Sequence, residues 1–157
     1  MPELIHTILD AGVGSRLRLA KKTDKRTGTL IGLRFTKLSR GLWLHIQFDD
    51  GKIETYWKPK EVRLLEKSPV YCSWDTGREW KVIGDGFPPN LVGIIYRRQR
   101  MTEELDHRGE NVWVEVGFDI VRPVTDGDNS KRVCEGPYPL FQTALQKLLG
   151  TTDARTA

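Results

Sequence analysis

Apolar and polar residues alternate along several short segments in the first 66 residues of the chain. In a β-strand every second side chain shares a face, so each alternating segment predicts a strand with one face turned to a core. In segment 42–48 this alternation leaves Trp43, His45 and Gln47 on the outer face. The predicted strands and their core-side residues are a first strand within 14–22 with Leu17 and Leu19, 27–35 with Thr29, Ile31, Leu33 and Phe35, 42–48 with Leu42, Leu44, Ile46 and Phe48, and 52–57 with Ile53, Thr55 and Trp57.

The residues between these strands are those that tight turns require. Asp50 and Gly51 predict a two-residue type I′ hairpin loop, because glycine accepts the positive φ of that turn. Pro59 marks a further turn, and residues 61–65 are typical of a short strand or a single helical turn. Short antiparallel strands joined in this way bury a core by curling closed. Residues 1–66 therefore predict a small antiparallel barrel.

The pattern at 42–49 recurs 70 residues later, at 112–119. Each segment has a tryptophan between two aliphatic residues and ends in Phe-Asp. The segment 90–98 precedes the second copy as a strand-like partner, and a longer loop at 99–111 connects the two. This favours a degenerate second barrel in 67–135, although two unrelated core strands can also share such a pattern. No clean returning strand follows the second copy, and the residues just after the first barrel have no counterpart.

Near the C-terminus the spacing of apolar residues changes to that of a helix. Phe141, Ala144, Leu145 and Leu148 fall at i, i+3, i+4 and i+7, which places them on one face. Gly150 is expected to end this helix after about three turns, because glycine accepts the left-handed conformation found there. The helix is expected to pack on the neighbouring barrel, and binding to a separate partner is the alternative. The chain is thus predicted to be mainly β, with one or two small barrels and a short C-terminal helix.

Composition fits one ordinary domain or two very small ones. The chain has 157 residues, of which 38% are hydrophobic and 29% charged, and this balance is typical of a folded protein in water. No apolar run is long enough to cross a bilayer, and the N-terminal residues lack the features of a signal peptide. We therefore expect a cytoplasmic protein without a membrane partner. Cys72 and Cys134 are expected to be reduced, a bridge between them being the alternative.

Residues that could carry chemistry are scattered along the chain. His6, His45 and His107 lie far apart and share no metal-ligand spacing with the cysteines. No nucleophile motif or glycine-rich phosphate loop is present, and the paired carboxylates at 49–50 and 103–104 stand where turns and loops are expected. The sequence therefore predicts a binding module with no catalytic residues, no metal and no cofactor.

Positive charge is concentrated in the first half of the chain. Residues 1–65 hold 13 Lys and Arg against 7 Asp and Glu, a net charge of +6, whereas residues 66–157 hold 12 against 14, a net charge of −2. Cations attract phosphates without reading bases, so the imbalance favours a polyanionic partner, and a solvated loop is the alternative. The candidate nucleic-acid-binding residues are Arg16, Arg18, Lys21, Lys22, Lys25, Arg26, Lys52, Lys58 and Lys60.

Three aromatic side chains form a second candidate surface. Strand alternation turns Trp43, Tyr56 and Trp113 away from the core. Large exposed rings usually mark either a contact or a binding site. These rings are therefore expected to form a platform for a base or a protein partner, or to be covered in a contact between the two barrels. The covered arrangement is favoured.

The order of these segments resembles a known fold. GSRLRL, a basic loop, GTLIGL, a polar loop, LWLHIQFDDGK, a turn and KEVRLLE are similar to the SH3-like small barrel of Tudor-type and KOW-type domains. In particular they resemble the tandem Tudor-like domains of bacterial RNA-polymerase-associated Snf-type ATPases. The resemblance implies a bacterial or phage-type module with an SH3-like barrel at 1–66, a degenerate one at 67–135, and a helix with a polar tail at 136–157.

Barrels of this kind bind DNA, RNA, peptides and methylated side chains, so the fold leaves the ligand open. The leading hypothesis is a non-enzymatic module that binds nucleic acid, DNA rather than RNA, or a nucleic-acid-processing protein complex, through the basic loop. The alternative is an adaptor that receives a peptide or a partner subunit on surface aromatics, with Trp43, His45 and Tyr56 as the contacts.

Overall fold

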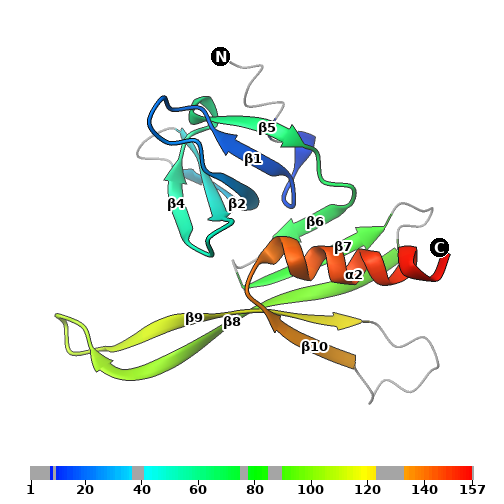
Figure 1. Ribbon diagram of the computed structural model, residues 1–157. Coiled ribbons are helices and arrows are strands. Elements are labelled where there is room, and N and C mark those ends of the chain that lie inside the picture. The colour runs from blue at the N-terminus through cyan, green and yellow to red at the C-terminus, as the bar shows by residue number, and fades with distance from the viewer. Residues whose placement is uncertain are drawn as a thin grey trace.

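The computed structural model describes residue 8 and residues 10–36, 41–74, 78–84, 90–122 and 133–156 (Figure 1). In this part of the chain the protein is mainly β, with two antiparallel sheets of five strands each and one helix near the C-terminus. The elements in chain order are β1 (Arg16–Leu19), β2 (Thr27–Thr36), β3 (Gly41–Phe48), β4 (Ile53–Trp57), the 3-10 turn η1 (Pro59–Glu61), β5 (Val62–Glu66), β6 (Tyr71–Trp74), β7 (Glu79–Gly84), β8 (Asn90–Leu105), β9 (Asn111–Arg122), β10 (Val133–Tyr138) and α2 (Phe141–Thr156).

The first sheet has the strand order β4-β3-β2-β1-β5. The core faces predicted for β1 and β3 are confirmed, because all six of their core-side residues are at most 5% exposed. Among the described residues β4 and β5 are edge strands, so backbone hydrogen bonds close neither this sheet nor the second into the barrel that we expected. The first core consists of Ile8, Leu17, Leu19, Leu30, Leu42, Leu44, Ile46, Phe48 and Val62.

The hairpin between β3 and β4 has three loop residues instead of the predicted two. Phe48 N donates to Lys52 O at 2.8 Å, and Gly51 N donates to Phe48 O at 2.9 Å. Asp49, Asp50 and Gly51 therefore form the loop. Gly51 has a φ of 99°, which suits a three-residue loop whose last residue is left-handed.

A bulge in β2 overturns the predicted facing of the first part of that strand. Leu30 and Gly32 pair with consecutive residues of β3, so Ile31 is an extra residue in the ladder. Because an extra residue reverses the alternation, Leu30 lies in the first core, and Ile31 packs with Trp80 in the core of the second sheet. After the bulge, Leu33 packs against the first core as predicted. Phe35 lies opposite Leu42 on the predicted face but is 69% exposed, so its prediction as a core residue was wrong.

A second register shift lies between β3 and β4. Leu44 pairs with Trp57 and Ile46 pairs with Glu54, which gives β4 one more residue than β3 over this stretch. As a result Trp57 packs against the first core, whereas Ile53 packs against the second. The prediction that these two side chains share a face was wrong.

The second sheet has the order β10-β9-β8-β7-β6, so every strand pairs with its neighbours in the chain. The returning strand that the sequence did not reveal is β10, and the residues without a counterpart in the first unit supply β6 and β7. The recurring pattern lies in β3 and β9, and each is second from an edge of its sheet. The strand orders of the two sheets therefore correspond position by position. The exception is the edge strand next to β1 or β7: β5 is the last strand of the first sheet in the chain, whereas β6 is the first strand of the second.

Beyond the sheet, β8 and β9 continue as a hairpin that projects away from the rest of the molecule (Figure 1). The segment 99–111, which was expected to be a loop, is mostly strand. Only three residues form the turn, which is bounded by a hydrogen bond from Asp106 N to Glu110 O at 2.8 Å and contains Gly109 at a φ of 79°. We call residues 97–117 the arm.

The helix α2 packs on the second sheet (Figure 1). Its four predicted core residues are at most 2% exposed, which confirms the predicted face. The helix does not end at Gly150 and continues to Thr156. A glycine inside a helix costs only about 1 kcal/mol relative to alanine, so it does not oblige the helix to stop. The second core consists of Val13, Ile31, Cys72, Trp80, Val82, Ile95, Phe118, Ile120, Phe141, Ala144, Leu145 and Leu148.

Buried hydrogen bonds join the two sheets. Trp80 Nε1 donates to Ile31 O at 2.6 Å. Phe141 N donates to Gln47 Oε1 at 2.6 Å, and Gln47 Nε2 donates to Pro139 O at 2.9 Å. Gln47, which alternation placed on an outer face, is therefore only 4% exposed and accepts a hydrogen bond from the first turn of α2.

Candidate functional site

Arg16, the first of the nine candidate cations, is held by an acidic side chain. Its guanidinium donates to the Asp49 carboxylate at 2.7 and 2.8 Å and to Thr29 Oγ1 at 2.9 Å. The hydrogen bonds from Arg16 and from the Thr27 hydroxyl lower the pKa of Asp49, while partial burial opposes them. Arg16 therefore stabilises the fold and is neutralised within the molecule.

Arg26 is neutralised in the same way. Its Nη2 lies 2.9 Å from Asp24 Oδ2, and its Nη1 lies 2.9 Å from Glu54 Oε2. The hydrogen bonds to Asp24 and then to Glu54 raise the pKa of Arg26. The guanidinium carbon also lies 4.1 Å from the centre of the Phe48 ring. This arginine thus ties the β1–β2 loop to β4.

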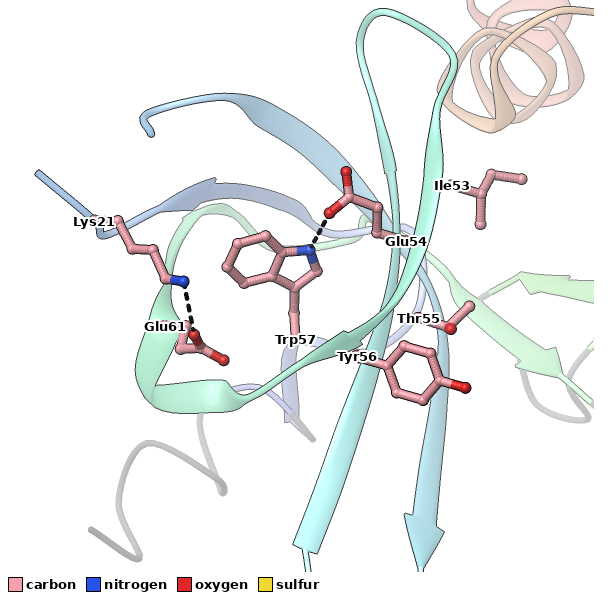
Figure 2. A pocket seen from close by; sticks show the side chains of 7 residues that line it. All are labelled: Lys21, Ile53, Glu54, Thr55, Tyr56, Trp57 and Glu61. Carbon is pink, nitrogen blue, oxygen red and sulfur yellow. Dashed lines mark hydrogen bonds and ion pairs between the residues drawn. The ribbon is translucent and has the colours of Figure 1, made fainter. Parts of the chain in front are cut away.

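Lys21 ties the same loop to η1. Its Nζ lies 3.3 Å from Glu61 Oε2 and 4.8 Å from the centre of the Trp57 ring. Figure 2 shows the Trp57 indole between Lys21 and Glu54, with Nε1 donating to Glu54 Oε1 at 3.0 Å. An open pocket of about 480 Å³ lies at this position beside β4 and is lined by Lys21, Ile53, Glu54, Thr55, Tyr56, Trp57 and Glu61.

Lys22, Lys25 and Lys60 remain available to a ligand. All three are exposed, and they form no ion pair within the part of the chain that the structure describes. A hydrogen bond from Ala20 N to Glu61 O at 2.8 Å holds the β1–β2 loop against η1. The lysines of these two segments therefore gather at one end of the first sheet, which we call the lysine end.

Two other predicted cations lie elsewhere on the first sheet. Lys52 precedes β4, whereas Lys60 follows it, so the length of β4 separates them. Arg18 points outward from β1, directly opposite Arg63 of β5, and both side chains are exposed. Arg63 was not among the candidates, although its place between two apolar residues predicts an outward side chain.

Trp43 and Tyr56 meet on the outer face of β3 and β4. Their ring centres lie 5.8 Å apart at an interplanar angle of 83°, and Tyr56 is 78% exposed. Lys58 Nζ lies 5.4 Å from the centre of the Trp43 ring. Arg34, which the sequence analysis did not single out, is exposed and directly opposite Trp43 on β2. We call these four residues the aromatic cluster.

Trp113 does not belong to this cluster. It lies on the arm, directly opposite Met101, and is 58% exposed. The favoured arrangement, in which outward rings are covered between the two sheets, is therefore not found for Trp113, because the arm carries it away from both cores.

His45 stands beside the aromatic cluster on β3. Burial lowers its pKa, and the positive charges of Arg34 and Arg97 lower it further. Because Arg97 belongs to β8, the outer face of β3 lies near the base of the arm. The imidazole is consequently biased towards its neutral form, and the positive charge of this region comes from the arginines and from Lys58.

Chemistry of other kinds finds little support among the described residues. They contain no group of three or more His, Cys, Asp or Glu side chains placed to hold a metal ion, and His6 lies outside them. Cys72 and Cys134 are free thiols, and burial raises the pKa of Cys72 to about 12. In the described part of the chain, no helix combines the length and the apolar character that a membrane span requires.

Comparisons with protein-family models, with curated proteins and with solved structures find no match to this chain.

Proposed function

We propose that this protein binds nucleic acid without catalysing a reaction, using the lysine end and the aromatic cluster of the first sheet. The observation that carries the proposal is the sorting of the cations. Arg16, Lys21 and Arg26 are paired with acids, whereas Lys22, Lys25 and Lys60 are exposed and unpaired within the described residues. Unpaired lysines offer charge that a phosphate backbone can neutralise.

The aromatic cluster adds a second mode of contact. A base can stack on an exposed ring whatever its identity, and nearby cations can hold the adjoining phosphates. Tyr56 offers an exposed ring, and Arg34 and Lys58 supply cations beside Trp43. Unpaired bases are accessible for such stacking, whereas bases in a duplex are not. We therefore infer a preference for single strands over duplexes.

The first sheet is proposed to be an SH3-like small barrel. Its strand order and the 3-10 turn between β4 and β5 support this assignment. The gap beside β4 is bridged by side chains of the β1–β2 loop, through Lys21 with Glu61 and Arg26 with Glu54. Side-chain contacts would then close the barrel where backbone pairing does not.

Fluorescence anisotropy with labelled single-stranded and duplex oligonucleotides tests the charge contribution. The triple variant Lys22→Glu, Lys25→Glu, Lys60→Glu should lose at least about 10-fold in affinity at low salt, with a shallower dependence on salt. A control variant reverses two exposed cations away from the lysine end, Arg78→Glu just before β7 and Lys81→Glu within β7, and should bind as the wild type does. Equal losses in both variants, or no wild-type binding at low salt, would rule out this surface.

The stacking contribution needs its own variant. Tyr56→Ala should weaken binding of a single strand about 5-fold to 100-fold while leaving the salt dependence unchanged, because it removes a ring and no charge. Trp113→Ala removes an exposed ring outside the aromatic cluster and should have little effect. If the wild type binds duplex as tightly as a single strand, and Tyr56→Ala changes neither affinity, the proposed base stacking is refuted. This holds even if the lysine-end variant loses affinity as expected.

A second candidate function is favoured by β4, an edge strand with an open pocket beside it. An extended peptide can add to such an edge through main-chain hydrogen bonds while its side chains enter the neighbouring pocket. Peptides selected from a random library should then shift the backbone amide resonances of β4 and the indole resonance of Trp57. Shifts confined to other strands would exclude this mode.

A further inference from the structure

Beyond its base, the arm has no further strand partner among the described residues. β7 pairs with β8 only as far as Tyr96, and β10 pairs with β9 only from Phe118 onward. At the base of the arm, Arg97 N still donates to Arg78 O at 2.8 Å, and Gly117 is buried. From 98 to 116 the two strands pair with each other alone, and none of these residues belongs to either core. Isolated two-stranded hairpins are marginally stable in water, so a feature of this length calls for a contact.

An apolar pair lies midway along the arm. Met101 is directly opposite Trp113, so the two side chains share a face, and they are 55% and 58% exposed. Leu105, nearer the tip, is 62% exposed. Large exposed apolar side chains gathered on one element are typical of an interaction surface. Tryptophan in particular is enriched among residues that dominate binding energy.

The charges of the arm are ordered along its length. Towards the base lie Arg97, Arg98 and Arg100, while the tip carries four acids and one cation, which are Glu103, Glu104, Asp106, Glu110 and Arg108. Arg97 pairs with Glu115, and Arg98 pairs with Asp119. Arg100 and the four tip acids are exposed and form no ion pair in the described part of the chain. The apolar pair thus stands between a cationic base and an acidic tip.

This order is self-complementary. In a two-fold contact the same surface serves both subunits, so a patch on the axis meets its own copy and each end meets the opposite end. Two arms packed antiparallel would bring the Met101–Trp113 pairs together at the axis. They would also bring the acidic tip of each arm beside the cationic base of the other. The tip acids repel a phosphate backbone, which argues against nucleic acid as the occupant.

We propose that the arm is a self-association surface, on which a second copy of this chain packs antiparallel about a two-fold axis through the Met101–Trp113 pair. The contact is small compared with obligate dimer interfaces, so the dimer should be reversible and dependent on concentration. The surface is separate from the lysine end and from the aromatic cluster. It does not rest on the proposed nucleic-acid binding.

Sedimentation velocity over a concentration series measures the association. The wild type should form dimers at low salt, and Trp113→Ser should raise the dissociation constant at least about 10-fold. The matched control Tyr71→Ser removes an aromatic side chain that is 66% exposed on β6, and should dimerise as the wild type does. A wild type that stays monomeric at about 1 mM, or equal losses in both variants, would overturn the proposal.

A charge exchange tests the antiparallel arrangement. Arg100→Glu alone should weaken the dimer because it removes the unpaired cation of the base and adds a negative charge near the partner's acidic tip. Glu103→Arg with Glu104→Arg should weaken it because the tip then adds positive charge near the partner's base. The triple variant should regain most of the affinity, since both sides of each contact are exchanged. Losses that simply add in the triple variant would exclude this arrangement. All four residues involved, Arg100, Glu103, Glu104 and Trp113, are exposed, so the variants should retain the wild-type unfolding midpoint.

Cross-linking gives a readout that does not depend on affinity. A Met101→Cys variant, made with Cys134→Ser to remove the exposed native thiol, places the new thiols beside the axis. Mild oxidation should yield covalent dimers from this variant and none from Cys134→Ser alone. No dimer above that background would contradict the position of the axis.

Discussion

Gln47 offers the sharpest test of how the two sheets are joined. The substitution Gln47→Met keeps a side chain of similar length and removes both polar groups. It leaves Phe141 N without its acceptor and Pro139 O without its donor. Gln146→Met makes the same chemical change at an exposed position of α2 and serves as the matched control.

The expected loss follows from the burial of the orphaned groups. Phe141 is fully buried, so its unpaired N–H should cost about 1–3 kcal/mol. Pro139 is exposed, so its carbonyl can turn to water and should cost less than about 1 kcal/mol. We therefore expect Gln47→Met to lower the free energy of unfolding by about 1–4 kcal/mol. For a chain of this size, that corresponds to a fall of roughly 2–16 °C in melting temperature.

Urea denaturation followed by tryptophan fluorescence and by far-UV circular dichroism measures this loss. Trp80, one of five tryptophans, lies at the junction of the two sheets, so part of the fluorescence change reports on that contact, while circular dichroism reports on both sheets. Gln146→Met should stay within about 0.5 kcal/mol of the wild type. If Gln47→Met unfolds at the same urea concentration as Gln146→Met, Gln47 does not hold α2 to the first sheet.

Asp49→Asn should reduce stability at neutral pH, because the depressed pKa of Asp49 means that its ionised form is favoured by the fold. That contribution to stability is present above the usual aspartate pKa of about 3.9 and is lost as pH falls through the lowered pKa. The unfolding free energies of the two proteins should therefore converge in acid. A difference in unfolding free energy that stays constant with pH would exclude the ion pair with Arg16. Cys134 should react with a thiol reagent in the native protein, whereas Cys72 should react only on unfolding because burial raises its pKa to about 12; two equally fast thiols would contradict this burial. Gly150→Ala should raise the free energy of unfolding by about 0.5–1 kcal/mol, because α2 continues through this position with open space around an added Cβ, and a decrease would instead place the helix end there.

Alternation was sufficient where the strand itself contains no extra residue. The register shifts along β1 and β3 place the extra residue in the partner strand, and the core residues of β1 and β3 were predicted correctly from spacing alone. It failed at β2 because Ile31 is an extra residue in the ladder, and a bulge leaves no mark on composition. Glycine at position 32 is the only local hint, since glycine in a strand often accompanies a bulge.

The arm escaped prediction for a different reason. Between Arg100 and Glu110 the residues are mostly charged or polar, and periodicity can reveal a strand only when one of its faces is buried. These strands are held by pairing with each other. Gln47 was missed because the partners that hold it to Pro139 and to α2 are backbone atoms 92 and 94 residues away. The predicted nucleic-acid-binding residues were uncertain for a similar reason. The sequence shows where lysines and arginines stand, but it does not show which of them pair with an acid in the folded protein.

The single extra residue at position 31 limits how this chain can be divided. One strand contributes Leu30 to one hydrophobic interior and Ile31 to the other, and the carbonyl of Ile31 also receives the indole hydrogen of Trp80. A fragment that ends at Glu66 would expose the Ile31 side chain to water. The rest of the chain would lose this residue from the second core. The two halves are therefore not independent folding units. Grafting the N-terminal half onto another protein would require a polar residue in place of Ile31.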